Sequence, residues 1–313
     1  MPSSTSILYI YPTMHTPLAW KDFSTRNIEL LGLPKITFWN YKKIAKTLFK
    51  RKKNNCDLGK EEIIVFSNIG FYLQNKFVKF WDIKFLKLLK RKYKIGIYFD
   101  DTINQYKRTN TWFWITNCLL PLVDYNFTYC KNDSESFNIP FVNAVFENFK
   151  IQNSPVKKYD LVMISTVLDE RRAESCLKIF KNPKFSLLKS FLYAADWNGL
   201  LNKEEIICPQ KSVDCKDYFG YTNTILFLKT TDKYFTNTPS FCIKNNIKLL
   251  TDCEFTYNLI NDPKKVKLIK DWSNISDEDI LWCKEVDAAP YNKEARKLVD
   301  WDNFGQRLLD AIK

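Results

Sequence analysis

Hydrophobic residues in the first half of the chain fall into short continuous runs, separated by stretches whose apolar positions have a helical spacing. Brief β-branched or aromatic runs that end in polar residues are typical of buried strands. Residues 40–53 and 73–92 are predicted to be helices. The predicted strands of this half are Ile7–Tyr11, Ile63–Ser67, Lys94–Phe99, Tyr125–Tyr129 and Val142–Val145.

The pattern breaks at residues 153–159, where an Asn-Ser-Pro sequence and two lysines predict a linker. A second series of strands and helices follows the linker. Its predicted strands are Tyr159–Ser165, one within Phe185–Tyr193, Glu205–Cys208, Thr224–Leu228 and Ile247–Thr251. Its predicted helices are Glu170–Phe180, Ser240–Asn245 and the strongly amphipathic Trp301–Ile312.

Two successive series in which strands alternate with helices predict two parallel sheets with helical crossovers. A chain of 313 residues also exceeds the size at which a single core stops growing. We therefore predict an α/β protein with two Rossmann-like domains, residues 1–153 and 154–313, facing a central cleft. In such folds ligands bind at the carboxyl ends of the strands.

The charge of the chain is distributed unevenly. Residues 1–150 hold 23 lysines and arginines against 12 acids, whereas residues 151–313 hold 25 against 23. The basic field therefore belongs to the first half, and it predicts an anionic partner there. Nucleic acid, an anionic membrane surface and a phosphorylated substrate all fit this prediction.

Cysteine, histidine and glycine usage narrows the chemistry. The nine cysteines form no CxxC pair, and His15 is the only histidine, so we expect no zinc site. An odd number of cysteines without a secretory leader favours a reducing cytoplasm, and the longest apolar runs are too short to span a membrane. With only 7 glycines, the chain contains no P-loop or GxGxxG motif.

The segment 159–172 (YDLVMISTVLDERR) runs from a predicted strand through a polar loop into a helix. Thr166 lies at the end of the strand, and Arg171 and Arg172 lie near the start of the helix. Helix N-termini attract anions, and arginines bind phosphates through two hydrogen bonds at once, so this segment is a candidate diphosphate site. The alternative is that both arginines face solvent, balanced by Asp169 and Glu170.

The segment 230–240 (TTDKYFTNTPS) has the same arrangement, with a hydroxyl-rich loop leading into a helix. Thr238 or Ser240 is suited to cap that helix, and Pro239 to its first turn. The hydroxyls of Thr236, Thr238 and Ser240 suit phosphate and ribose oxygens. An ordinary capped helix entry explains the same residues equally well.

At these two segments the second half resembles the C-terminal domain of small bacterial GT-B glycosyltransferases that build lipopolysaccharide core or capsule. Residues 248–251 (KLLT) and the closing segment 301–309 (WDNFGQRLL) share this resemblance, which covers about half of the chain. It implies a nucleotide-sugar donor in the second domain. Many retaining relatives carry a glutamate in or before the helix at 240–243, where this chain has SFCI, so a GT-B-like subunit without catalysis is an alternative.

Three residues of the first half are candidates for the base that deprotonates an acceptor hydroxyl. Asp100 and Asp101 follow the predicted strand that ends at Phe99, and His15 lies in the loop after the first strand. The adjacent acids do not have the Asp-x-Asp spacing with which GT-A enzymes bind metal, so we expect no metal cofactor. Helix capping by Asp101 and an incidental His15 are the alternatives.

Basic and aromatic residues are mixed in residues 76–94, and residues 42–53 are rich in lysine. If both segments are helical, Phe77, Trp81, Phe85, Leu88 and Leu89 share one side of the second helix, with most lysines elsewhere. The lysines suit peripheral contact with an anionic membrane. The alternative is that the apolar sides pack on the sheet and the lysines are only solvated.

These patterns together predict a metal-independent, hexosyltransferase-like glycosyltransferase. Its expected partners are a nucleotide sugar and a glycan or lipid-linked acceptor of surface polysaccharide synthesis. We expect a cytoplasmic location with peripheral contact at the inner face of the membrane. A basic nucleic-acid-binding protein is the rival class, but the sequence contains no recognition module for nucleic acid, so no such partner is expected.

Overall fold

A computed structural model describes residues 6–12, 28–33, 39–50, 62–67, 76–99, 103, 110–145, 154–167, 169–196, 199–201, 213–228 and 235–312. The chain divides into two compact units. Unit 1 is Met1–Asn148 together with Asp300–Lys313, and unit 2 is Phe149–Val299.

Unit 1 contains a parallel five-stranded sheet in the order β2-β1-β3-β4-β5. Four of its strands confirm the sequence prediction. They could be predicted because their apolar residues form continuous runs. The strand Ile28–Leu33 was not predicted. The bounds are β1 Ser6–Pro12, β2 Ile28–Leu33, β3 Glu62–Ser67, β4 Lys94–Phe99 and β5 Tyr125–Thr128.

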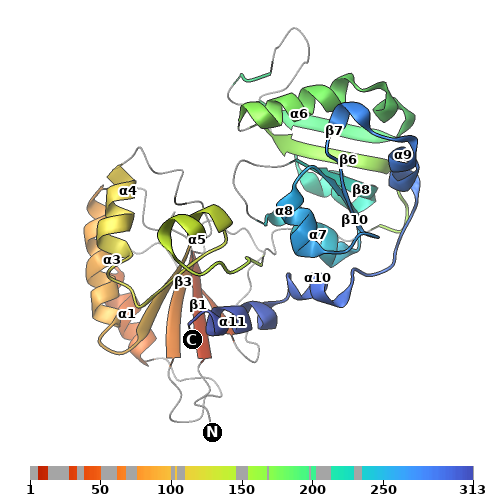
Figure 1. Ribbon diagram of the computed structural model, residues 1–313. Helices are drawn as coiled ribbons and strands as arrows, with labels where there is room; N and C mark the ends of the chain where they lie inside the picture. The colour runs from red at the N-terminus through yellow and green to blue at the C-terminus, as the bar shows by residue number, and fades with distance from the viewer. Residues whose placement is uncertain are drawn as a thin grey trace. The chain divides into compact units, whose positions relative to one another are not determined.

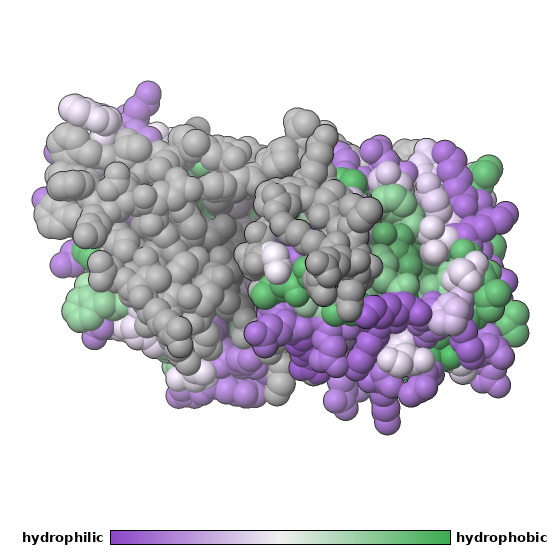
Figure 2. Space-filling view, turned by 90° about the horizontal axis from the view of Figure 1, so that it is seen from above, coloured by the Kyte–Doolittle hydropathy of each residue, from purple (hydrophilic) through white to green (hydrophobic). Residues whose placement is uncertain are grey.

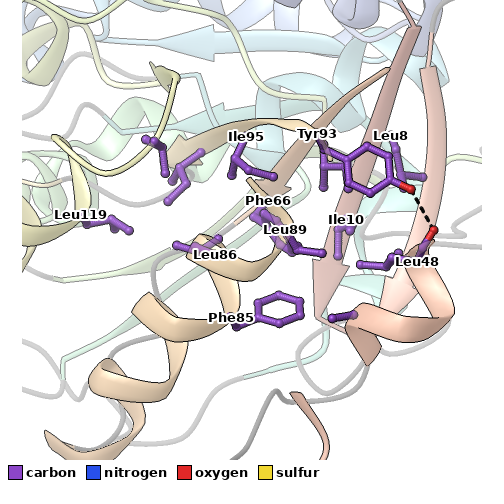
Figure 3. Close-up of a cluster of buried hydrophobic side chains, with 14 of the residues drawn as sticks. Leu8, Ile10, Leu48, Phe66, Phe85, Leu86, Leu89, Tyr93, Ile95 and Leu119 are labelled. Carbon is purple, nitrogen blue, oxygen red and sulfur yellow. Dashed lines mark hydrogen bonds between the residues drawn. The ribbon is translucent and has the colours of Figure 1, made fainter. Parts of the chain in front are cut away.

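Helices α1 (Tyr41–Lys50) and α3 (Lys76–Leu89) cover one face of this sheet (Figure 1). The side chains of Leu8 and Ile10 in β1 point toward these helices, and Leu48, Phe85 and Leu89 pack against them (Figure 3). The Tyr93 hydroxyl donates a hydrogen bond of 2.9 Å to the Leu48 carbonyl oxygen, which fixes α1 to the turn before β4. The apolar side chains that the structure describes in these two helices therefore pack on the sheet, and the side chains of Phe77 and Trp81 lie outside the described ones.

The opposite face of the sheet holds α11 (Trp301–Asp310), close to the strands in Figure 1. The Phe304 ring meets the rings of Tyr9 and Tyr98 edge to face, with centroids 5.4 Å apart in both pairs. The Trp301 ring packs against the Tyr9 ring, with the two ring centroids 6.2 Å apart. The predicted boundary, with residues 154–313 in the second domain, is corrected for residues 301–312, because the apolar side of α11 is buried on aromatic residues of unit 1.

Unit 2 contains a second parallel five-stranded sheet, in the order β10-β9-β8-β6-β7. Numbered from the first strand of each unit, both sheets have the order 2-1-3-4-5. The bounds are β6 Tyr159–Thr166, β7 Ser190–Ala195, β8 Thr222–Phe227, β9 Lys248–Thr251 and β10 Val266–Leu268. The two parallel sheets confirm the predicted α/β class with two Rossmann-like domains.

Helices cover both faces of the second sheet. Leu161 and Met163 of β6 belong to a core cluster with α6 (Glu170–Lys181) and α9 (Asp277–Lys284). Val162 belongs to the opposite cluster, with α7 (Asn237–Asn245) and α10 (Lys293–Lys297). A strand buried on both faces is apolar at successive positions, which explains why the sequence predicted β6. The other described helices are α4 Asn110–Trp114, α5 Lys131–Phe137 and α8 Glu254–Ile260, with a π-helical turn at Ile115–Leu119 and short 3₁₀ turns at Pro183–Leu187, Cys215–Asp217, Phe219–Tyr221 and Trp272–Asn274.

Two strand predictions were wrong in part or in full. Val142–Val145 is not a strand, and only a single bridge between Thr128 and Phe141 pairs this stretch with the sheet. In Phe185–Tyr193 the first residues form a 3₁₀ turn and the strand starts at Ser190. The predicted strand Glu205–Cys208 lies outside the described residues.

Asparagine takes the place of glycine at three helix ends. Asn138, Asn246 and Asn261 are the C-caps of α5, α7 and α8, with φ angles of 51°, 57° and 48°. This left-handed conformation is usually filled by glycine, and asparagine tolerates it best among the other residues. The use of asparagine explains how a chain with 7 glycines ends its helices sharply.

Within the described residues, every helix is too short or too polar to cross a lipid bilayer. Hydrophilic and hydrophobic side chains are both exposed on the face shown in Figure 2.

The Phe304→Ala substitution tests the assignment of α11 to unit 1. Removing a buried phenylalanine costs about 3–5 kcal/mol, and this loss should lower the stability of unit 1 alone. Hydrogen exchange followed by mass spectrometry should show lost protection in peptides from β1 and β4 and unchanged protection in β6 and β9. Gln306→Ala, at an exposed position of the same helix, is the control. Lost protection in unit 2 would contradict the assignment.

Candidate functional site

The strand order of unit 2 locates its ligand-binding edge. β6, the first strand of this sheet in sequence, lies between β7 and β8. The second strand, β7, is added on one side of β6, and the later strands β8, β9 and β10 are added on its other side. Open parallel sheets bind ligands at this switch point, beside the carboxyl ends of the two strands. Met163 of β6 pairs with Leu226 of β8, and the two strands end at Thr166 and Phe227, so their carboxyl ends lie near each other. Thr166 is the last residue of β6, and the segments that follow the two strands hold the other residues predicted to bind the donor.

The first of these segments enters α6. Asp169 is the N-cap of the helix, and its carboxylate accepts a hydrogen bond of 2.8 Å from the backbone N–H of Arg172. The Arg172 side chain is 7% exposed, and its Nη1 donates to the Thr166 carbonyl oxygen at 2.7 Å. Its buried Nε has no partner among the residues that the structure describes. Arg171 is exposed. The two arginines are therefore not equivalent: one is held at the end of β6, and the other extends into solvent.

The second segment enters α7. Thr236 is the N-cap, in extended conformation, but its hydroxyl caps no N–H of the helix. Within the described chain, the Thr236 hydroxyl, the Asn237 amide oxygen and the Ser240 hydroxyl are all buried without a hydrogen-bond partner. Ser240 is 0% exposed. Three buried oxygens without partners at one helix N-terminus need an explanation, because leaving each one unpaired costs about 1–3 kcal/mol.

The same helix end supplies hydrogen-bond donors. The N–H groups of Asn237 and Thr238 lie in the first turn, where no preceding turn offers an acceptor, and Pro239 has no N–H. The Ser240 N–H is already bonded to the Thr236 carbonyl oxygen at 3.3 Å. Two N–H groups without a partner in the described part of the chain, two hydroxyls and the positive end of the helix dipole form a site suited to phosphate oxygens. The half-buried side chain of Thr238 is at the same end.

Asn237 is the residue of this site that the sequence analysis did not include. Its signal was present: it directly follows the N-cap, in a segment already chosen for its hydroxyls. Cys242, in the segment SFCI that contains no acid, is fully buried in the core beneath α7. Burial raises the pKa of its thiol, so the side chain stays neutral and packs as an apolar group. This position faces the core.

Other carboxylates at the same edge are occupied by structural contacts. Asp196 follows β7 and accepts the N–H groups of Leu200 and Leu201 at 3.1 and 2.8 Å. Asp252 follows β9 and accepts from the Ser175 hydroxyl at 3.2 Å and from the Trp272 indole N–H at 3.0 Å. These carboxylates order the loops around the site. Among the described residues, no three histidine, cysteine or acidic side chains are placed together to hold a metal ion.

The three candidate bases of unit 1, His15, Asp100 and Asp101, lie outside the described residues. Described residues on either side of the two acids are Phe99, the last residue of β4, and Ile103. The Ile103 N–H donates to the buried carboxylate of Asp133 in α5. The roles of the three candidates stay predictions.

Comparison with solved structures identifies the fold as a whole. One matching structure is an alpha-glucosyltransferase in complex with UDP and a 13-mer DNA containing a central A:G mismatch, with 10% identity, a TM-score of 0.52, and coverage of 98% of this chain and 99% of that chain. Another is an alpha-glucosyltransferase in complex with UDP, with 9% identity, a TM-score of 0.50, and coverage of 98% and 94%. No protein-family model and no curated protein matches the sequence. The chain has the two-domain GT-B fold, and at this identity the likeness concerns the fold alone.

Proposed function

We propose that this chain is a glycosyltransferase that takes a sugar from a nucleotide-sugar donor bound to unit 2. The observation that carries the proposal is the group of buried oxygens without partners at the N-terminus of α7, beside the switch point of the sheet. A diphosphate with a ribose offers acceptors for the free N–H groups and the hydroxyls, and a donor for the Asn237 amide oxygen. The fold is one on which UDP is bound in the two similar structures.

Each donor-binding residue then has a distinct role. Ser240 and Thr236 bind phosphate oxygens through their hydroxyls, and Thr238 supplies an N–H and a hydroxyl. Arg172, held at the carbonyl of Thr166, contributes positive charge from the end of β6, and Arg171 reaches the diphosphate from solvent. Cations placed where the leaving diphosphate gains charge perform the task that a metal performs in other enzymes. The proposed reaction is therefore metal-independent.

In this proposal the acceptor, a glycan or a lipid-linked glycan of surface polysaccharide synthesis, binds to unit 1. Its hydroxyl loses a proton to Asp100, Asp101 or His15 as the new glycosidic bond forms and the nucleoside diphosphate leaves. The lysine excess of residues 1–150 favours an anionic acceptor or an anionic membrane nearby. Peripheral contact through residues 42–53 and 76–94 on the cytoplasmic side would bring the enzyme to a lipid-linked acceptor.

Nucleotide binding tests the donor site. In calorimetric titrations with UDP, GDP and CMP, one nucleotide family should bind the wild-type chain equally well with and without EDTA. Ser240→Ala should weaken that binding about 10-fold or more, since a hydrogen bond to a charged group contributes about 1.5–3 kcal/mol. The same variant should keep the wild-type melting temperature, because the Ser240 hydroxyl has no partner among the described residues.

Ser186→Ala is the matched control, because it removes an exposed serine hydroxyl elsewhere in unit 2. It should bind the nucleotide as the wild type does. Binding that survives Ser240→Ala unchanged would contradict the proposed donor site, and loss of binding in EDTA would contradict metal independence.

Three single variants test the base. If one of Asp100→Asn, Asp101→Asn and His15→Gln removes the base, its kcat should fall by about 10²–10⁴ with nucleotide affinity unchanged. Transfer is measured to glycan and lipid-linked acceptors, and also to duplex DNA, since one similar structure holds DNA. Wild-type kcat in all three variants would exclude these residues as the base.

A further inference from the structure

A groove of about 640 Å³ lies in unit 1 between the edge strand β2 and helix α1. Its walls are apolar: Leu31 and Leu33 come from β2, and Ile44 and Leu48 come from α1. Its other lining residues are Asn40, Lys43, Thr47 and Lys50. The volume falls in the range of small-molecule sites, roughly 300–1,000 Å³.

Two hydrogen bonds fix the C-terminal end of α1. The Tyr93 hydroxyl donates to the Leu48 carbonyl oxygen at 2.9 Å, and the Lys92 ammonium donates to the Phe49 carbonyl oxygen at 2.8 Å. These bonds tie α1 to the turn before β4, away from the edge strand. Leu31 and Leu33 are two positions apart in β2, so they lie on the same face of the strand. Both are only half-buried.

The rim of the groove is cationic. Helix α1 contains four lysines and no acid. Lys43 and Lys50 are seven positions apart, which places both on one side of the helix, along the groove. Both are exposed, and neither forms an ion pair within the part of the chain that the structure describes. Lys46 lies between them in the sequence; it is also exposed and forms no ion pair with any described residue.

An aromatic residue marks one end of the groove. Trp39 is 89% exposed and directly precedes Asn40, which lines the groove. Exposed tryptophans beside lysines are typical of surfaces that meet the interface of a lipid bilayer. At about 1.5 Å per residue, α1 is about 15 Å long. A groove along it can therefore hold a hydrocarbon chain of the length that fills one leaflet of a bilayer, roughly 15 Å.

We propose that the β2–α1 groove binds one hydrocarbon chain of an anionic membrane lipid, with Trp39 at the interface, Lys43 contacting the phosphate of that lipid, and Lys50, about 10 Å further along the rim, contacting the phosphate of a neighbouring lipid. The apolar walls bind the chain, and the unpaired lysines bind the charge. Nucleic acid satisfies the lysines but offers no hydrocarbon for the leucines. The inference does not need sugar transfer to be correct; where both hold, the groove positions unit 1 at lipid-linked acceptors.

Vesicle binding by the full chain tests the charged rim. Co-sedimentation is measured at physiological salt with phosphatidylcholine vesicles, with and without phosphatidylglycerol. The wild type should bind only the anionic vesicles. Lys43→Glu/Lys50→Glu should weaken binding at least about 25-fold, because each lysine near an anionic surface contributes a factor of about five. Lys264→Glu/Lys293→Glu changes the net charge equally at exposed positions of unit 2 and should retain wild-type binding.

A soluble probe tests the apolar walls. Lysophosphatidylglycerol below its critical micelle concentration should bind the wild type, and lysophosphatidylcholine and inorganic phosphate should bind at least tenfold more weakly. Leu33→Gln and Thr47→Gln keep the net charge and should each reduce binding of the probe and of anionic vesicles. The second variant changes an exposed position and leaves the fold intact.

Two results would overturn the proposal: equal loss of vesicle binding in the two charge variants, or wild-type binding of the lysolipid by both glutamine variants. Nucleotide titrations on the same proteins report on unit 2. Lipid binding without nucleotide binding would support the proposed lipid groove and contradict only the proposed donor site. Nucleotide binding without lipid binding would support the donor site and contradict only the lipid groove.

Discussion

The hydrogen-bonding requirement of buried polar groups is the constraint on which the functional account depends. Nearly every buried oxygen in a folded protein has a partner, because an unpaired one keeps the full cost of leaving water. At the start of α7, the Thr236 and Ser240 hydroxyls and the Asn237 amide oxygen lack one among the described residues. The fold places these atoms beside the switch point of a parallel sheet, where a ligand can supply the missing bonds.

Around this point hydrogen bonds hold several of the described side chains in place. Asp169 caps α6, Arg172 is tied to the end of β6, and Asp252 joins the loop after β9 to Ser175 and Trp272. Fixed donors cost little reorganisation when charge develops on a leaving group. The charge of the chain follows a different pattern: the lysine excess belongs to residues 1–150. In α1 the lysines border an apolar groove and have no acids beside them. Unit 2 thus carries the features of a phosphate site, and unit 1 those of a surface for an anionic partner.

The sequence predicted all the central strands and missed two of the four edge strands. β6 is buried on both faces, so its apolar run is continuous and needs no tertiary information to be recognised. β2 is an edge strand of unit 1 with half-buried leucines, and β10 is an edge strand of three residues; neither was predicted. The reverse error occurred at residues 142–145, where apolar side chains are buried without any ladder of strand pairing.

The helices that follow β6 and β8 could be predicted, because polar residues separate each from the apolar strand before it, although the second helix begins at Asn237 and not at Ser240. What could not be predicted was the state of each side chain. Arg171 and Arg172 look equivalent in sequence, yet only the second returns to the strand end. The position of α11 also depends on tertiary contacts, since its amphipathic pattern does not say which aromatic residues Phe304 meets.

The most direct measurement is a crystal structure of the chain with UDP, or with whichever nucleoside diphosphate binds most tightly. The account predicts diphosphate oxygens within hydrogen-bonding distance of the Ser240 hydroxyl and of the N–H groups of Asn237 and Thr238, with Arg172 close by. A diphosphate bound elsewhere, with the oxygens at the start of α7 bonded only to water, would contradict it.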